Sequence, residues 1–243
     1  MRRLFITLFL LLFVTHSFAA LPATDAFSGT NAPLSGSANW SLCGCTAEDG
    51  IDEGSGYITP SEVGASDNAY YWNADTFADD QYGQKVMTQD NDSANHRIGI
   101  MLRAGAGTGG FLVRYLTATA DSDFRAYYYT AQDTRTRLAD SVMTADNATI
   151  DTANDAFDPS ESFLAGDIMR IEVVGKTLTL KIDFGSGFVT QGSWDATGVG
   201  PDSGSVGLYM AGAVGATAVR GDDWEGGDLA AAGVAVQRRR HMQ

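Results

Sequence analysis

The clearest fold signal is the stretch DIMRIEVVGKTLTLKID, residues 167–183. Apolar and polar side chains alternate on both sides of a Gly175-Lys176 pair, which is typical of a turn between two strands. The pattern predicts an antiparallel hairpin with one face on a core and the other in solvent. The expected core-facing residues are Met169, Ile171, Val173, Leu178, Leu180 and Ile182, and the expected solvent-facing residues are Arg170, Glu172, Thr179 and Lys181.

The same period recurs along most of the chain, between clusters of Gly, Asp, Asn and Ser, and no helical stripe of useful length competes with it. Residues 204–210 repeat the alternation and should bury Val206, Leu208 and Met210. Further strands are expected near residues 25–27, 56–59, 68–72, 81–88, 97–103, 110–118, 124–131, 137–143 and 218–224. About a dozen short strands predict an all-β fold, a two-sheet antiparallel β-sandwich forming a single domain over residues 20–229, with a long loop at 144–162.

The charge composition limits which binding partners are expected. The 243 residues contain 16 Lys and Arg against 30 Asp and Glu, a formal net charge of −14. Such an excess of carboxylate repels nucleic acids and anionic lipid surfaces, so neither is an expected partner. At 44% hydrophobic residues the chain is still able to build a sizeable core, which excludes wholesale disorder.

Both ends differ from the middle. Residues 1–19 have a basic start, an apolar run too short to span a bilayer and a small-residue cleavage pattern, which predicts a signal peptide and a secreted or otherwise extracytoplasmic protein with no transmembrane segment. Residues 230–243 form a tail with three consecutive arginines, Arg238–Arg240. The tail is either solvated or an electrostatic tether onto an anionic polysaccharide or another acidic copy of the chain. Asn39, Asn91 and Asn147 begin glycosylation sequons.

Cys43 and Cys45 are the two cysteines of the chain, separated by one glycine. A metal site needs two more ligands, and neither a second cysteine pair nor a suitable histidine pair is present in the sequence. We expect a local disulfide or two free thiols.

Two stretches resemble the concanavalin A-like, laminin G-like jelly-roll superfamily. At the front, Asp25-Ala26-Phe27, Leu34 and Trp40 are similar to the "D-x-F … L … W" opening of secreted bacterial and phage members, and the closing strands resemble its hairpin, "G-x-V-G-L" strand at 204–208 and acidic-aromatic end, Asp222-Asp223-Trp224. The resemblance implies that the first and last strands pair. Phe27 and Trp224 would then pack near the termini, and Gly207 would permit close approach to a neighbouring strand.

Members of this superfamily mostly bind glycans or proteins, and some hydrolyse polysaccharides. Retaining hydrolases of this fold carry an E-x-D-x-x-E pattern, which places two carboxylates on one strand face. The nearest string here, Glu48 to Glu53, is out of register, and its glycine-rich flanks suggest a loop. Ser-His-Asp catalysis with His96 is not expected, because the sequence contains no G-x-S-x-G motif to supply the nucleophilic serine. The glycine-rich residues 105–110 are expected to form a hairpin loop. No catalytic residue is therefore assigned, and an enzyme related to 3-keto-disaccharide hydrolases stays an alternative.

A binding surface has better support. Arg125, Tyr127 and Tyr129 should share one face of a strand, where aromatic rings and arginines suit sugar rings and their hydroxyl groups. Arg114 and Tyr115, together with Trp72, could extend this surface; in the alternative interpretation, the tyrosines belong to the core.

Calcium is the one cofactor considered, as a structural ion. Asp25, Asp222 and Asp223 would converge if the first and last strands pair, and carboxylate oxygens are the ligands that calcium prefers.

These observations predict an exported, non-enzymatic module that binds a glycan or an extracellular matrix or surface polymer. One alternative is a structural, self-assembling surface protein that uses the same face as an interface. The other is the glycoside-processing enzyme.

Overall fold

The structure is a computed structural model that describes residues 22–46, 50–61, 67–89, 96–107, 109–117, 123–132, 134–138, 140–143, 165–212 and 219–229. Within these residues the chain is built almost entirely of strands. They are β1 (Ala23–Asp25), β2 (Trp40–Leu42), β3 (Ile51–Gly54), β4 (Tyr57–Pro60), β5 (Asn68–Trp72), β6 (Gln81–Gln89), β7 (His96–Gly105), β8 (Gly109–Thr117), β9 (Asp123–Ala131), β10 (Thr134–Arg137), β11 (Asp140–Met143), β12 (Ile168–Val174), β13 (Thr177–Asp183), β14 (Phe188–Asp195), β15 (Ser205–Ala211) and β16 (Arg220–Asp228), with one short 3-10 helix, η1 (Leu34–Gly36).

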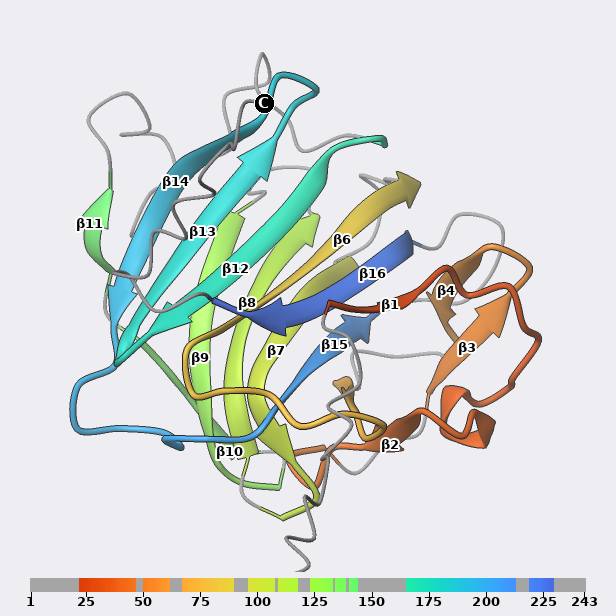
Figure 1. Ribbon diagram of the computed structural model, residues 1–243, viewed down its shortest axis with the longest axis horizontal. Helices are drawn as coiled ribbons and strands as arrows, with labels where there is room; N and C mark the ends of the chain where they lie inside the picture. Colours follow the sequence, from red (N-terminus) through yellow and green to blue (C-terminus); the bar gives the residue numbers. More distant parts are fainter. Residues whose placement is uncertain are drawn as a thin grey trace, which may run out of the picture.

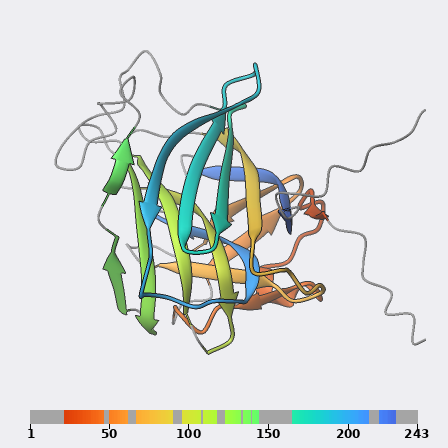
Figure 2. The ribbon, with the colours of Figure 1, turned by 60° about the vertical axis from the view of Figure 1, so that its left-hand side comes forward.

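The described strands form two antiparallel sheets that pack face to face (Figure 1). The nine-stranded sheet has the order β11-β14-β13-β12-β6-β16-β4-β3, with β1 added beside β16. The seven-stranded sheet has the order β10-β9-β8-β7-β15-β5-β2. Figure 2 shows β12–β14 and β7–β9 as separate layers, so each sheet has an inner face on the core and an outer face. The predicted two-sheet antiparallel sandwich is confirmed.

The hairpin at residues 167–183 forms as its alternation predicts. β12 pairs with β13 in unbroken register from Ile168–Asp183 to Val174–Thr177. Met169, Ile171 and Val173 are buried with Leu178, Leu180 and Ile182, while Arg170, Glu172 and Lys181 are half-buried and Thr179 lies on the same outer face. Alternate burial of this kind is what positions charged side chains on the outer surface of the nine-stranded sheet.

The first and last strands pair, as the resemblance implied. Asp25 lies opposite Trp224 in the β1–β16 ladder. Trp224 stacks on Trp72 with ring centroids 5.2 Å apart and meets the ring of Trp40 edge-on at 4.8 Å, and Phe27 lies beside Trp40. This aromatic cluster therefore joins the terminal strands of one sheet to β2 and β5 of the other.

Glycine at position 207 is required by the packing of β15 against β5. A Cβ atom at this position would lie 2.0 Å from the carbonyl oxygen of Tyr70. The expected close approach of a neighbouring strand is therefore present.

A lysine lies between the sheets. Lys85 points inward from β6 and is 1% exposed, and its Nζ donates a long hydrogen bond of 3.4 Å to the carbonyl oxygen of Tyr209. Burial lowers the pKa of Lys85 well below its ordinary value, because an apolar interior disfavours the ammonium form.

The structure differs from the predicted strands at four places. β2, β3 and β14 were not predicted, and the segment expected at 137–143 is instead parts of two strands, β10 and β11, which lie in different sheets. The prediction that Glu53 lies in a loop is wrong, because Ile51–Gly54 is strand β3 paired with β4. The predicted signal peptide (1–19), the loop at 144–162 and the basic tail (230–243) lie outside the described residues. No helix of the described part is long and apolar enough to cross a membrane.

Candidate functional site

The outer face of the seven-stranded sheet gathers arginines. Arg114 pairs with Arg125 across β8 and β9, Arg135 pairs with Tyr129, and Arg137 pairs with Tyr127 across β9 and β10. Directly opposed residues share a sheet face, so the predicted set of Arg114, Arg125, Tyr127 and Tyr129 does lie on one surface. We call this surface the arginine face and include in it Arg97, Arg135, Arg137, Tyr209 and Asp67.

Arg114 is at the centre of this face and is 4% exposed. Its Nη2 donates to the hydroxyl of Tyr127 (3.0 Å) and its Nη1 to the hydroxyl of Tyr209 (3.2 Å). Burial alone would lower the pKa of the Arg114 guanidinium, but the two phenol groups more than offset this and raise the pKa. The guanidinium therefore stays charged at physiological pH, held by the hydroxyls of two tyrosines.

Asp67 joins the other arginines to this centre. Its carboxylate accepts a hydrogen bond from the hydroxyl of Tyr209, lies 3.2 Å from Nη1 of Arg97 and forms an ion pair with Arg135. The guanidinium carbons of Arg114 and Arg135 lie 4.9 and 5.1 Å from the centre of the Tyr127 ring. Tyr127 therefore holds two arginines in place instead of offering an open ring to a sugar.

The tyrosines of this face are buried. Tyr127 is 8% and Tyr129 2% exposed, and both belong to a second apolar cluster, separate from the core between the sheets. The cluster also contains Met101, Leu112 and the two cysteines, Cys43 and Cys45, which are joined in a disulfide. Arg125 and Arg135 are half-buried and Arg137 is exposed, so the accessible rim of the face consists of arginine side chains.

Two predicted residues lie elsewhere. Trp72 and Tyr115 point into the core between the sheets, where Trp72 packs with Trp40 and Trp224, and Tyr115 lies 5.0 Å from Phe124. This corrects the expectation that they extend the platform. The reason is the period of two: Tyr115 neighbours Arg114 in sequence and therefore faces the opposite side of the sheet.

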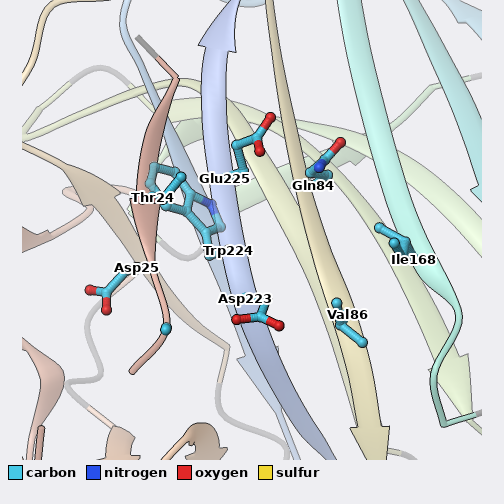
Figure 3. A pocket seen from close by; sticks show the side chains of 9 residues that line it. Thr24, Asp25, Gln84, Val86, Ile168, Asp223, Trp224 and Glu225 are labelled. Carbon is cyan, nitrogen blue, oxygen red and sulfur yellow. The ribbon is translucent and has the colours of Figure 1, made fainter. Parts of the chain in front are cut away.

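The three predicted calcium ligands approach one another without forming a metal site. The Asp25 carboxylate accepts hydrogen bonds from the Phe27 backbone N–H and from Nε1 of Trp40, both at 2.8 Å, and Figure 3 shows it directed away from Asp223. Burial raises the pKa of Asp222, and the charges of Asp223 and Asp25 add to the rise. Among the residues that the structure describes, no group of three or more His, Cys, Asp or Glu is arranged to hold a metal ion.

Glu53, the last carboxylate of the string compared with the hydrolase pattern, has a role in the fold. It is 8% exposed and accepts hydrogen bonds from the backbone N–H of Gly29 (2.7 Å) and from the side-chain amide of Asn31. These contacts fasten the segment after β1 to β3.

Five residues of this face were not predicted from the sequence: Asp67, Arg97, Arg135, Arg137 and Tyr209. Tyr209 had a readable signal, because it occupies an outward position in the alternation of Val206, Leu208 and Met210. Asp67 and Arg135 had none, since their contact joins segments far apart in the sequence.

A cleft on the other sheet was also missed. It encloses about 370 Å³ on the nine-stranded sheet and is lined by residues of β1, β6, β12 and β16 (Figure 3). Gln84 and Glu225 line it, and beside them the Tyr82 hydroxyl donates to Glu225 while the guanidinium of Arg170 lies 3.7 Å from the centre of the Tyr82 ring. Gln84 and Arg170 lie at outward-facing positions of two strands with alternating apolar and polar residues, and this alternation is the sequence signal from which the surface could have been predicted.

No protein-family model and no curated protein sequence matches this chain. Solved structures do match its fold. The CBM2 module of Lactobacillus casei BL23 phage J-1 evolved Dit aligns over 84% of this chain and 93% of that module, with a TM-score of 0.52 and 11% identity.

Two larger proteins also match. They are a xylan β-1,4-xylosidase from Bacillus halodurans C-125 (TM-score 0.53, 10% identity) and GH43B of the Bacteroides ovatus xyloglucan PUL (TM-score 0.52, 14% identity). Each match covers 88% of this chain but only 40% and 41% of those chains, so this chain spans about two fifths of their length. At this level of identity the likeness shows the fold alone, which is a two-sheet, antiparallel β-sandwich.

Proposed function

We propose that this chain is an exported, non-enzymatic carbohydrate-binding module and that its ligand contacts the arginine face. The observation that carries the proposal is the network of Arg114, Tyr127, Tyr209 and Asp67 on a sheet face that points away from the core. Desolvating charged groups costs free energy, so a buried guanidinium that two tyrosine hydroxyls hold on an outer face favours a role in recognition over a role in folding alone.

The rim of this face supplies the contacts. Arginine donates several hydrogen bonds in a planar fork and fits hydroxyl and carboxylate oxygens alike. The described side chains of the face include five arginines, at positions 97, 114, 125, 135 and 137, against the single carboxylate of Asp67. In a chain with a net charge of −14 this concentration of positive charge favours glycans that carry carboxylate or sulfate groups.

Export is supported by two observations. The predicted signal peptide lies at residues 1–19, and the disulfide between Cys43 and Cys45 is of the kind that persists in oxidising compartments. The fold is also similar to a domain named as a carbohydrate-binding module, the phage CBM2 module.

The test is a glycan array followed by calorimetry on the mature protein. Replacing Arg125 and Arg137 together by Ala should weaken binding of an acidic glycan at least about tenfold, since a hydrogen bond to a charged group contributes about 1.5–3 kcal/mol. Arg220→Ala is the matched control, because Arg220 lies on β16 of the other sheet, over the ring of Tyr57. Binding to no glycan, an equal loss in both variants, or sustained release of reducing ends would overturn the proposal.

A further inference from the structure

The outer face of the nine-stranded sheet carries a second feature, a row of polar side chains in direct register across six strands. Each residue of the row lies opposite the next in the ladders β1–β16, β16–β6, β6–β12, β12–β13 and β13–β14. The row, from β1 to β14, consists of Thr24, Glu225, Gln84, Arg170, Lys181 and Thr190. None of the six is buried, and at about 4.8 Å between strands the row is about 24 Å long.

The cleft lies at the β1 end of this polar row. Val86 and Ile168 give it an apolar floor, and Gln84, Glu225 and Asp223 supply polar groups around that floor (Figure 3). Trp224 also lines the cleft, but its side chain is 1% exposed and its ring packs between the sheets against Trp40 and Trp72.

The middle of the polar row is held rigid by its neighbours. Arg170 stacks on Tyr82, donates through Nε to Glu172 (2.9 Å) and through Nη1 to Gln84 (3.3 Å). Lys181 donates to the other oxygen of Glu172 at 2.7 Å. Groups fixed before binding lose little conformational freedom on binding, which favours recognition.

An aromatic ring is exposed toward the β14 end. Phe188 is 39% exposed, and the guanidinium of Arg170 lies 5.5 Å from its ring centre. Aromatic side chains with an exposed ring suit the apolar C–H faces of sugar rings. The polar row therefore ends in an apolar-floored cleft on one side and a ring on the other.

The chemistry of the polar row selects a class of ligand. Amide, hydroxyl, guanidinium, ammonium and carboxylate groups follow one another, so donors and acceptors are mixed along its length, which matches groups that both donate and accept. Glu225, Asp223 and Glu172 repel a polyanion. A ligand with many neutral hydroxyl groups satisfies both conditions, and a row of this length is too long for one sugar ring.

We propose that the polar row and its cleft bind a segment of a neutral, linear polysaccharide laid across the strands, at a site separate from the arginine face. An ordinary solvated sheet face also carries polar residues. The fixed geometry of Arg170, the cleft and the exposed Phe188 together distinguish this face from an ordinary one.

The test is affinity electrophoresis of the mature protein in gels that contain xylan, hydroxyethyl cellulose, mannan or laminarin, with alginate and heparin as polyanions. At least one neutral polymer should retard the protein. Gln84→Ala and Phe188→Ala should each weaken that retardation at least about fivefold, whereas two matched variants of the same face outside the polar row, Thr88→Ala and Val174→Ala, should change it less than about twofold. Thr88 and Val174 are both exposed.

An oligosaccharide series made from the retarding polymer tests the length of the site. Affinity measured by calorimetry should rise from the dimer through about the pentamer, as expected for a row of about 24 Å. Failure of every neutral polymer to retard the protein, equal loss in the matched variants, or affinity that is flat beyond the dimer would overturn this inference. None of these results bears on the arginine face, which is tested with acidic glycans and its own variants.

Discussion

The outer faces of the two sheets use arginine in opposite ways. On the arginine face, Arg114 is 4% exposed and both of its terminal nitrogens donate to buried tyrosines. On the polar row, the side chain of Arg170 is 20% exposed, covers one face of Tyr82 and pairs with Glu172. Arg114 is shielded from solvent and depends on its tyrosine partners to stabilise its charge, whereas Arg170 stays partly exposed to solvent.

The difference shows how one fold can carry two kinds of surface. The arginine face is backed by a second apolar cluster, so its network is part of the packed structure and is expensive to disturb. The polar row lies on an open sheet face, where a substitution removes a contact without opening a cavity. Stability measurements should therefore separate the two faces more sharply than binding measurements do.

The largest expected effect is on the arginine face. Replacing Tyr127 and Tyr129 together by Ala should lower the free energy of unfolding by more than about 4 kcal/mol, because each removes a buried aromatic side chain. For a chain of this size the melting temperature should fall by more than about 10 °C. The open-face control, Phe188→Ala, should cost less than about 1 kcal/mol. Equal losses in differential scanning calorimetry would remove the distinction between the two faces.

A matched pair of arginines gives the next effect. Arg114→Met should cost about 3 kcal/mol, because it leaves the hydroxyls of Tyr127 and Tyr209 without their donor in a buried place. Arg170→Met should cost less than about 1 kcal/mol, as is usual for a partly exposed ion pair. Urea unfolding of both variants measures the difference, and a cost for Arg170→Met as large as that for Arg114→Met would contradict the contrast.

A third cation, Lys85, lies between the sheets and, among the described residues, pairs with neither a tyrosine hydroxyl nor a carboxylate. Its Nζ donates one long hydrogen bond of 3.4 Å to the carbonyl oxygen of Tyr209, so Lys85→Met should stabilise the protein by about 2 kcal/mol at pH 7. The folded-state pKa of Lys85 lies below its unfolded value of 10.5, so the unfolded state binds more protons in the window between the two.

The sign of the pH dependence follows from that window. The stability of the wild type should rise with pH relative to Lys85→Met, by at most about 1.4 kcal/mol per pH unit, in the window between the lowered folded-state pKa of Lys85 and 10.5. Urea unfolding at pH 7, 8 and 9 measures this. Lys176→Met is the control variant, because it removes a lysine that is partly exposed, donates to three carbonyl oxygens and pairs with Asp202.

Much of this arrangement was readable from the sequence, because it depends on a period of two. Alternation placed the β12–β13 hairpin and β15, and it also placed Arg125, Tyr127 and Tyr129 together on one face. β14 was missed because Phe188, Val189 and Thr190 at its start are all exposed, so no alternation is visible there. A strand that buries one face only along part of its length carries only part of the pattern.

The contacts that close the arginine face were beyond any local pattern. Tyr209 reaches Asp67 across a separation of 142 residues, and Arg135 meets the same carboxylate. Burial of Tyr127 and Tyr129 also depends on the cluster with Cys43 and Cys45, which lie far from them in the sequence. The alternation of the sequence predicts which face of a sheet a residue lies on, but the packing of the rest of the fold decides whether that face is exposed to solvent.

The smallest expected effect concerns calcium, at the edge of the polar row. Asp25 already accepts two hydrogen bonds, from Phe27 and from Trp40, so binding an ion there would remove contacts that hold β1 to the core. Adding millimolar CaCl2 to protein treated with EDTA should therefore change the melting temperature by less than about 1 °C. A calcium ion that bound the folded state would raise the melting temperature measurably once its concentration exceeded its Kd. Asp25→Asn is the companion variant: it should lower the melting temperature equally with and without calcium, because the amide keeps one acceptor oxygen and so leaves either the Phe27 N–H or the Trp40 Nε1–H without its acceptor. A calcium-dependent rise of several degrees in the wild type, abolished in Asp25→Asn, would instead make these carboxylates calcium ligands and place a divalent cation at the edge of the polar row.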